Sequence, residues 1–141
     1  MSTNDAPTIG AIAWADLTVP DAPKVRDFYK AVLGWDAAPV PMGTYNDFQM
    51  NLHGTDQPVA GICHARGVNA DLPAQWLLYV TVADMNASIL ACTKNGGAVI
   101  SGPRDMGAYG QLCVIRHPAG AVMALREPPP PAAAPATGKK L

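Results

Sequence analysis

The sequence predicts an α+β domain in which one βαβββ unit, a strand followed by a helix and three more strands, occurs twice. The first reason is internal repetition: LTVPD at 17–21 returns as VTVAD at 80–84, and MGTY at 42–45 returns as MGAY at 106–109. The second reason is that strand-like alternation is followed by helical spacing in the same order in both halves. Such units are too long for a solenoid repeat and too short for comfortable independent domains. We therefore expect the two halves to complete one pseudo-symmetric domain.

The first half predicts its elements in chain order. Residues 9–19 form a strand, and Asp21 is a good N-cap for a helix that ends at Gly34. An apolar stripe at helical spacing marks this helix: Val25, Phe28, Tyr29, Val32 and Leu33. Three strands follow at about 37–41, 45–52 and 59–65, separated by turns that contain Gly and Pro.

The second half repeats this order. A strand at 76–82 leads to Asp84 as the next N-cap, and Gly96-Gly97 ends the helix that follows it. Met85, Ile89 and Cys92 supply the apolar positions of that helix. The last three strands are expected near 98–101, 109–115 and 121–126.

The length of 141 residues suits one domain with a sizeable core. The predicted organisation is a flexible N-terminus at 1–8, a single domain at 9–127 with modules at 9–66 and 74–127, and a disordered Pro- and Ala-rich tail at 128–141.

Composition argues against several classes of function. No apolar run is long enough for a membrane span, and a net charge of −1 without a basic run does not suit nucleic-acid binding. Three cysteines without CxxC spacing favour a reduced, cytoplasmic setting. Charged residues are only 15% of the chain, so part of the surface is expected to be buried against a second subunit, in a homodimer.

Two motifs resemble those of a known family. Residues 21–34 read DAPKVRDFYKAVLG, which is similar to the D…FY…LG helix of the vicinal oxygen chelate superfamily, the group of glyoxalase I, bleomycin-resistance proteins and extradiol dioxygenases. PAG at 118–120 resembles the family's turn before its last strand, with His117 in place of Asp. Together with the duplication over 9–127, the resemblance implies a cupped mixed sheet with helices on its convex side and a ligand pocket on its concave side.

Alternation along each strand then predicts which side chains enter that pocket. Leu17 and Val19 should pack on the helices, so Trp14 and Asp16 should face the concave side. The predicted ligand-binding residues are Trp14, Asp16, Tyr45, Gln49, Tyr79, Tyr109, Gln111 and Arg126. Because half of these residues are aromatic, the expected partner is a small molecule that is aromatic or flat.

In the strand expected at 109–115, Leu112 and Val114 are expected against the helices, which places Tyr109, Gln111 and Cys113 on the concave side.

Metal-dependent members of the superfamily hold a divalent ion with His or Glu at four converging positions. The resemblance places these positions at Trp14, Gly61 (within one residue), Leu77 and Ala124, none of which has a metal-binding side chain. His64 lies one strand face away. We therefore expect no bound metal and no other cofactor.

Asp16 and Tyr79 are the candidate catalytic residues. A carboxyl group in an apolar cup has its ionisation disfavoured and can act as a general acid or base. The alternative is a structural role, in which a salt bridge to Arg126 or a hydrogen bond with Tyr79 satisfies Asp16. His53 and His117 are expected to tie down turns, and His64 is expected at the surface or in an interface.

Two functions remain open on the sequence alone. The first is a metal-free small-molecule-binding protein of the glyoxalase/bleomycin-resistance type. The alternative is a lyase, isomerase or dioxygenase-type enzyme of the same superfamily, either metal-independent with acid–base residues or metal-dependent.

Overall fold

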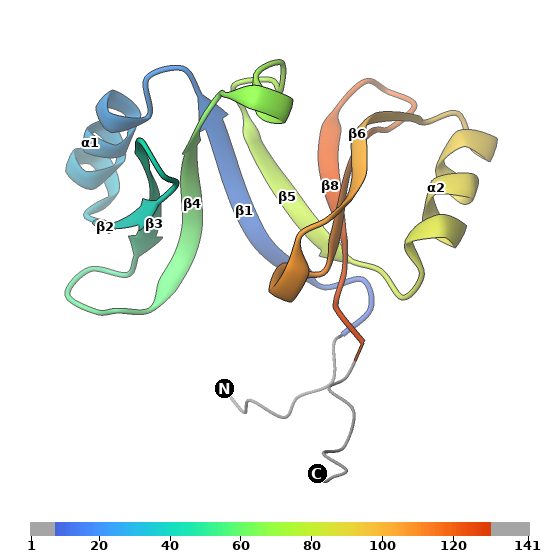
Figure 1. Ribbon diagram of the computed structural model, residues 1–141, viewed down its shortest axis with the longest axis horizontal. Helices are drawn as coiled ribbons and strands as arrows, with labels where there is room; N and C mark the ends of the chain where they lie inside the picture. The colour runs from blue at the N-terminus through green and yellow to red at the C-terminus, as the bar shows by residue number, and fades with distance from the viewer. Residues whose placement is uncertain (1–7, 131–141) are drawn as a thin grey trace, which may run out of the picture.

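The computed structural model describes residues 8–130 (Figure 1). The elements of the first half are β1 (Ile12–Val19), α1 (Ala22–Leu33), β2 (Asp36–Pro41), β3 (Asn46–Asn51) and β4 (Pro58–His64). Those of the second half are β5 (Trp76–Thr81), α2 (Met85–Lys94), β6 (Ala98–Asp105), β7 (Gln111–Arg116) and β8 (Val122–Glu127). The predicted βαβββ duplication is confirmed. Two single turns of 3₁₀ helix, η1 (Gly67–Asn69) and η2 (Gly107–Tyr109), are additional.

The eight strands form one mixed sheet in the order β2-β3-β4-β1-β5-β8-β7-β6. Within each module the first and last strands are parallel, β1 with β4 and β5 with β8, whereas β1 and β5 join the modules as antiparallel neighbours. In Figure 1 these two strands lie in the middle, with α1 and α2 at opposite ends. A surface between the modules is therefore built from both halves of the chain.

Helix α1 forms where its sequence signals predict. The Asp21 side chain accepts a hydrogen bond from the Lys24 amide at 3.2 Å, and Gly34 ends the helix in the left-handed conformation with φ 76°. Val25 and Tyr29 pack against the sheet. Phe28, Val32 and Leu33, which the apolar stripe also included, are more than half exposed, because the stripe is wider than the face that contacts the strands.

Helix α2 is capped by two acidic side chains. Asp84 accepts from the Ala87 amide at 3.1 Å, and Glu127 of β8 accepts from the Met85 amide at 2.6 Å. Buried Met85 then packs with residues of β7 and β8. No helix in the described residues is long and apolar enough to cross a membrane.

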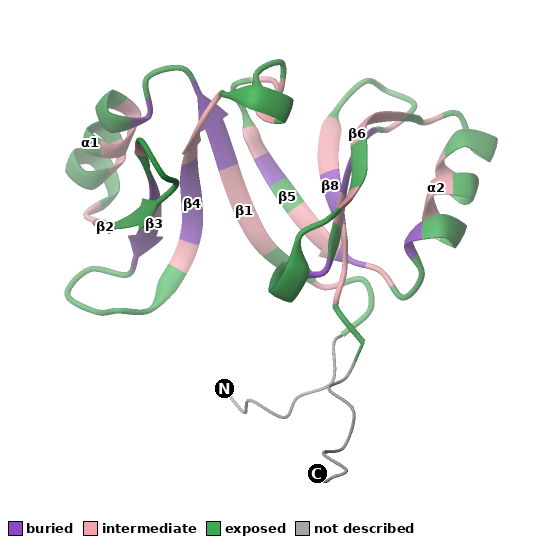
Figure 2. Ribbon diagram, viewed as in Figure 1, coloured by how far each residue is buried: buried purple, intermediate pink, exposed green. Residues whose placement is uncertain are grey.

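The core has three parts. One lies between α1 and the first half of the sheet, and one between α2 and the second half. The third lies on the opposite face of the second half, where Leu77, Val114 and Ala124 are covered by Leu72 and Ile100. In Figure 2 the buried residues lie mainly along the strands, whereas both helices are largely exposed or intermediate.

The predicted facing of β7 is wrong. Cys113 is buried against α2, together with Met85, whereas Val114 lies in the core on the opposite face with Leu77. The prediction took apolar Leu112 and Val114 as facing the helices, but the concave face of the second half is itself apolar, with Val114 in its core and Leu112 in the cavity wall. Cys113 and Ile115 face α2 instead, so apolar character alone does not identify the face of this strand.

The predicted N-terminus at 1–8 and tail at 128–141 fall mostly outside the described residues. Pro128, Pro129 and Pro130 belong to no helix or strand.

Candidate functional site

A cavity of about 520 Å³ lies on the concave face of the sheet and draws its lining from both modules. Six of the predicted ligand-binding residues line it: Trp14, Asp16, Gln49, Tyr79, Tyr109 and Arg126. Val40, Met42, Cys63, Met106 and Leu112 are further members of the lining that the sequence analysis did not propose as site residues. Most of the wall is therefore apolar or aromatic, with few polar groups, as in many small-molecule sites.

Tyr45 does not line this cavity. Its ring packs against His64, with 5.1 Å between the ring centroids, and the Arg66 guanidinium lies 4.1 Å from the centre of the tyrosine ring. Tyr45 precedes β3, which starts at Asn46. The alternation of strand faces was therefore extended to a residue that lies outside the strand.

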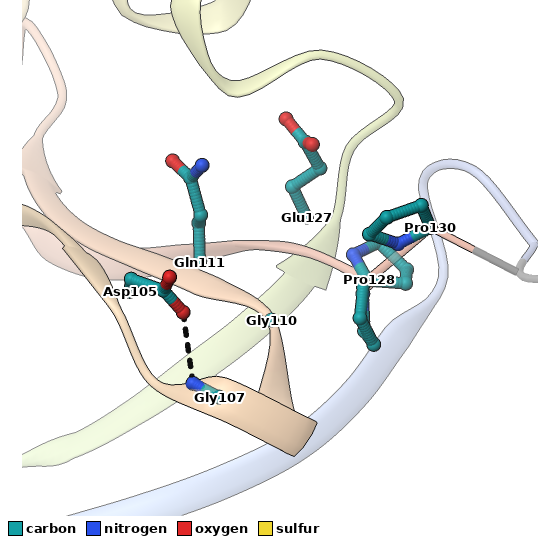
Figure 3. Close-up of a pocket in the computed structure, with 8 residues that line it drawn as sticks. Asp105, Gly107, Gly110, Gln111, Glu127, Pro128 and Pro130 are labelled. Atoms are coloured by element: carbon teal, nitrogen blue, oxygen red, sulfur yellow. Dashed lines mark hydrogen bonds between the residues drawn. The ribbon is translucent and has the colours of Figure 1, made fainter. Parts of the chain in front are cut away.

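Gln111 faces a different and smaller cavity of about 260 Å³ (Figure 3). Asp105, Glu127 and Pro128 also line it, and Asp105 accepts a hydrogen bond from the Gly107 amide at 2.9 Å. The prediction that Gln111 enters the concave site is thus wrong, and Leu112 is there instead.

The strand register places Asp16 and Tyr79 at the centre of the site. Asp16 is paired with Gly61 on one side and Leu77 on the other. Tyr79 is paired with Trp14 on one side and Ala124 on the other. The four positions that correspond to metal ligands in the family therefore surround this pair, in agreement with their predicted convergence.

The Asp16 carboxylate is held in one place by its neighbours. Its Oδ1 accepts a hydrogen bond from the Trp14 indole N–H at 2.6 Å. A Cβ atom added at Gly61 would overlap the same oxygen, so the carboxylate fills the space above that glycine. Burial raises the pKa of Asp16, while hydrogen bonds from Trp14 and Tyr79 lower it in part.

The expected alternative partner of Asp16 was Arg126, and that prediction is wrong. The Arg126 Nε–H donates to the Tyr109 carbonyl oxygen at 2.7 Å, and none of the ion pairs among residues 8–130 includes Asp16. The hydrogen bond with Tyr79 is the predicted alternative that the structure retains. Burial and the nearby Asp16 charge raise the pKa values of Tyr79 and Cys63, which therefore remain protonated at neutral pH.

The residues at the four family positions do not fit a divalent metal. Leu77 and Ala124 are 1% and 0% exposed, because the core formed with Leu72 and Ile100 covers them. Trp14 and Gly61 line the cavity but offer no ligand atom from a side chain. No group of three or more His, Cys, Asp or Glu side chains suited to a metal occurs in the part of the chain that the structure describes.

The sequence did not predict a part-buried histidine–aspartate pair beside the cavity. His64, which was expected at the surface or in an interface, has a side chain that is 16% exposed, and its Nδ1 lies 3.1 Å from Asp47 Oδ1. The same carboxylate oxygen accepts from the His64 backbone amide at 2.9 Å. The pair joins β3 to the end of β4, a contact between residues 17 positions apart that no local pattern indicates.

The two turn histidines are placed as predicted. His53 Nδ1 lies 3.1 Å from the Gly34 carbonyl oxygen, and His117 Nδ1 accepts from the Ala119 amide at 3.0 Å. Both rings therefore bind backbone groups of turns rather than the cavity.

The fold and the site together define a class of protein: a duplicated βαβββ cup with a ligand-sized cavity on its concave face. The model of the Glyoxalase/Bleomycin resistance protein/Dioxygenase superfamily matches residues 11–133. The chain belongs to this superfamily, and the resemblance in the helix and turn motifs is confirmed.

Two relatives are anthracycline biosynthesis proteins of Streptomyces. DnrV of Streptomyces peucetius is 32% identical over 127 residues, which cover 82% of this chain and 46% of DnrV. DauV of Streptomyces sp. strain C5 is 31% identical over 127 residues, with the same coverage. The chain thus spans about half the length of the curated relatives that it matches.

Methylmalonyl-CoA epimerase from Mycobacterium tuberculosis is a structural neighbour. It superposes with a TM-score of 0.53 at 18% sequence identity, and the match covers 93% of this chain and 97% of the epimerase chain. At this identity the similarity shows the fold alone.

Proposed function

We propose that this protein binds a flat aromatic small molecule in its concave cavity and does so without a bound metal ion. The observation that carries the proposal is the cavity itself, about 520 Å³ with a largely apolar and aromatic wall. A three-ring aromatic body fits a space of this size, and stacking on the rings of Trp14, Tyr79 and Tyr109 would stabilise it. The lack of metal ligands at the four family positions supports binding that depends on these side chains.

The names of two relatives support a ligand of this shape. DnrV and DauV are named for anthracycline biosynthesis, and an anthracycline is a flat polycyclic aromatic compound. The proposal extends only to this general shape.

The proposed assembly is a cytoplasmic homodimer. Its support is the low charge content of the chain and the exposed apolar side chains on the outer face of the sheet, such as Leu78, which is 43% exposed.

A second candidate function is acid–base catalysis without a metal. The specific observation in its favour is the raised pKa of Asp16 in a cavity, next to the Tyr79 hydroxyl. If Asp16 were a catalytic base, Asp16→Asn would abolish turnover of a bound compound while leaving its binding intact.

A matched pair of tyrosine variants tests the binding proposal. We expect anthracenemethanol, an uncharged three-ring aromatic alcohol, to bind the wild-type protein in a fluorescence titration. Tyr109→Ala should weaken this binding by roughly tenfold, because the lost ring belongs to the cavity wall. Tyr45→Ala removes an equal ring outside the cavity and should leave the dissociation constant unchanged.

Two results would overturn the proposal. One is the absence of binding by the wild-type protein. The other is an equal loss of affinity in Tyr45→Ala and Tyr109→Ala, since that would place the ligand elsewhere.

A further inference from the structure

We propose that the natural ligand carries a positively charged nitrogen, and that this ammonium group binds against Asp16 between Trp14 and Tyr79. The inference rests on the proposed function, because it names the chemical class of the ligand for the same cavity. Its basis is the polarity of the cavity, which has a fixed carboxyl group in its wall and, among residues 8–130, no basic side chain paired with that carboxyl group.

The first step is that Asp16 is a built feature of the cavity. The Trp14 indole N–H holds Oδ1 at 2.6 Å, and the space that the carboxylate fills exists only because residue 61 is glycine. A flexible surface aspartate would need neither arrangement. The carboxylate is therefore presented to the cavity in one orientation.

The second step is that no basic side chain neutralises this carboxylate. Of the described residues that line the cavity, only Arg126 is an arginine or a lysine. On β5, Thr81 pairs with Arg126 of β8, and Leu77 pairs with Asp16 of β1. These two positions of β5 are four residues apart, so the backbones of Arg126 and Asp16 are offset by roughly 13 Å along the strand direction. Arg126 Nε is in addition engaged by the Tyr109 carbonyl oxygen.

The third step concerns charge and burial. Burial of Asp16 away from water disfavours its charged form and raises its pKa, hydrogen bonds from Trp14 and Tyr79 oppose this in part, and the nearby Asp47 charge adds a smaller rise. A buried carboxylate without a counter-ion is costly, and a cation placed beside it offsets much of that cost. An ammonium group of the ligand would supply the missing charge.

The fourth step is the aromatic surroundings. Trp14 and Tyr79 flank Asp16, and both rings line the cavity. The faces of indole and phenol rings attract cations, most strongly where water is excluded. Trp14 and Tyr79 direct their N–H and O–H groups at Asp16, so an ammonium group would reach the carboxylate from the open side of the cavity and meet the ring faces only beyond it. An ionised carboxylate attracts such a group and repels a neutral carbonyl oxygen.

Three compounds with the same aromatic body test the inference: anthracenylmethylamine, anthracenemethanol and anthracenecarboxylate. They differ only in the group that would meet Asp16, which is respectively positive, neutral and negative. We expect the wild-type protein to bind the amine at least about tenfold more tightly than the alcohol, and the carboxylate most weakly.

Asp16→Asn isolates the charge, because the amide oxygen can still accept from Trp14. We expect this variant to bind the amine about tenfold more weakly than wild type and the alcohol within about twofold of wild type. Asp56→Asn, the same change on the exposed turn between β3 and β4, is the control and should keep the preference for the amine.

The outcomes separate the two proposals. If the alcohol binds but the amine is not preferred, or if Asp16→Asn keeps the preference, the ammonium site is wrong and the aromatic cavity stands. Tighter binding of the carboxylate, with its loss in Asp16→Asn, would mean that Asp16 acts as a protonated donor and would also overturn the inference. If none of the three compounds binds, the proposed function itself fails.

Discussion

Asp16 and Gly61 share one small volume, and this is the most specific single-residue feature of the site. The carboxylate occupies the place of a side chain that residue 61 does not have. The carboxyl group comes from the neighbouring strand β1, so the conformation of Asp16 depends on the absence of a side chain at residue 61.

Gly61→Ala should therefore destabilise the protein. The new Cβ would overlap Asp16 Oδ1, and overpacking of this kind costs about 1–3 kcal/mol in the free energy of unfolding. Urea denaturation measures the effect.

The same substitution in an Asp16→Ala background is the control. With the carboxylate removed, Gly61→Ala should be neutral or stabilising by up to about 1 kcal/mol, because alanine reduces the freedom of the unfolded chain. An equal loss of stability in both backgrounds would mean that the backbone at residue 61, and not Asp16, opposes a side chain.

The raised pKa of Asp16 predicts a pH dependence of stability. Because the folded protein binds the Asp16 proton more tightly than the unfolded chain does, this group favours folding fully below its usual pKa of 3.8. The contribution is lost as the pH rises through the folded-state value. Asp16→Asn should accordingly become more stable relative to wild type as the pH rises.

Urea denaturation of both proteins at intervals between about pH 4 and pH 8 measures this difference. Asp56→Asn controls for the chemical change on an exposed residue. A constant difference between Asp16→Asn and wild type across the range would contradict the assignment of a buried, unpaired carboxyl group to Asp16.

At the scale of elements, both helices begin with an aspartate, but the two caps differ. In the described structure, Asp21 is the only side chain that accepts a hydrogen bond from a backbone amide in the first turn of α1. The first turn of α2 has two acceptors, Asp84 and Glu127, and the second comes from β8. The start of α2 is thus tied to the last strand, whereas the start of α1 depends on its local sequence.

Asp21→Ala should lower the free energy of unfolding by about 0.5–2 kcal/mol, because the Lys24 amide loses its acceptor. Thermal and urea unfolding check this value. Asp56→Ala, on an exposed turn, should change stability by less than about 0.5 kcal/mol. Equal effects of the two substitutions would show that the cap contributes nothing.

At the scale of the whole molecule, the two halves repeat the same topology but not the same interior. The concave face of the second half is filled by Leu77, Val114 and Ala124 with Leu72 and Ile100 over them. The cavity is therefore displaced toward the first half, where Trp14, Asp16 and Gly61 remain open to it. The repeated topology therefore does not give a symmetric interior, because packed side chains fill part of the concave face in the second half only.

The proposed homodimer predicts a solution mass of twice 14.7 kDa in light scattering at micromolar concentration. Leu78 on β5 is 43% exposed and lies beside Ala15 of β1, at the junction of the modules. Leu78→Glu should shift the protein to a monomer, because it places a charge in an apolar interface.

Leu90→Glu is the matched control, since Leu90 is 70% exposed on α2, away from the module junction. It should leave the dimer intact. A monomeric wild-type protein would remove the basis for this assembly, and dissociation by Leu90→Glu alone would move the interface to α2.

Local signals in the sequence determined the order and type of the elements. Asp21 and Asp84 mark the helix starts, and the alternation around Leu17 and Val19 correctly places Trp14 and Asp16 on the concave face. These features depend on residues a few positions apart, so periodicity and capping chemistry reveal them.

Only the tertiary structure decided how these parts meet. Three features depend on another strand or on a turn between strands. They are the orientation of Leu112 into the cavity, the position of Asp16 above Gly61 and the contact between His64 and Asp47. The physical reason is that strand register and side-chain packing are set by partners distant in the sequence, and a shift of one residue reverses the face of every side chain. Periodicity carries no information about such partners. The sequence therefore predicted the cupped sheet, whereas side-chain packing determined where on its concave face the cavity lies.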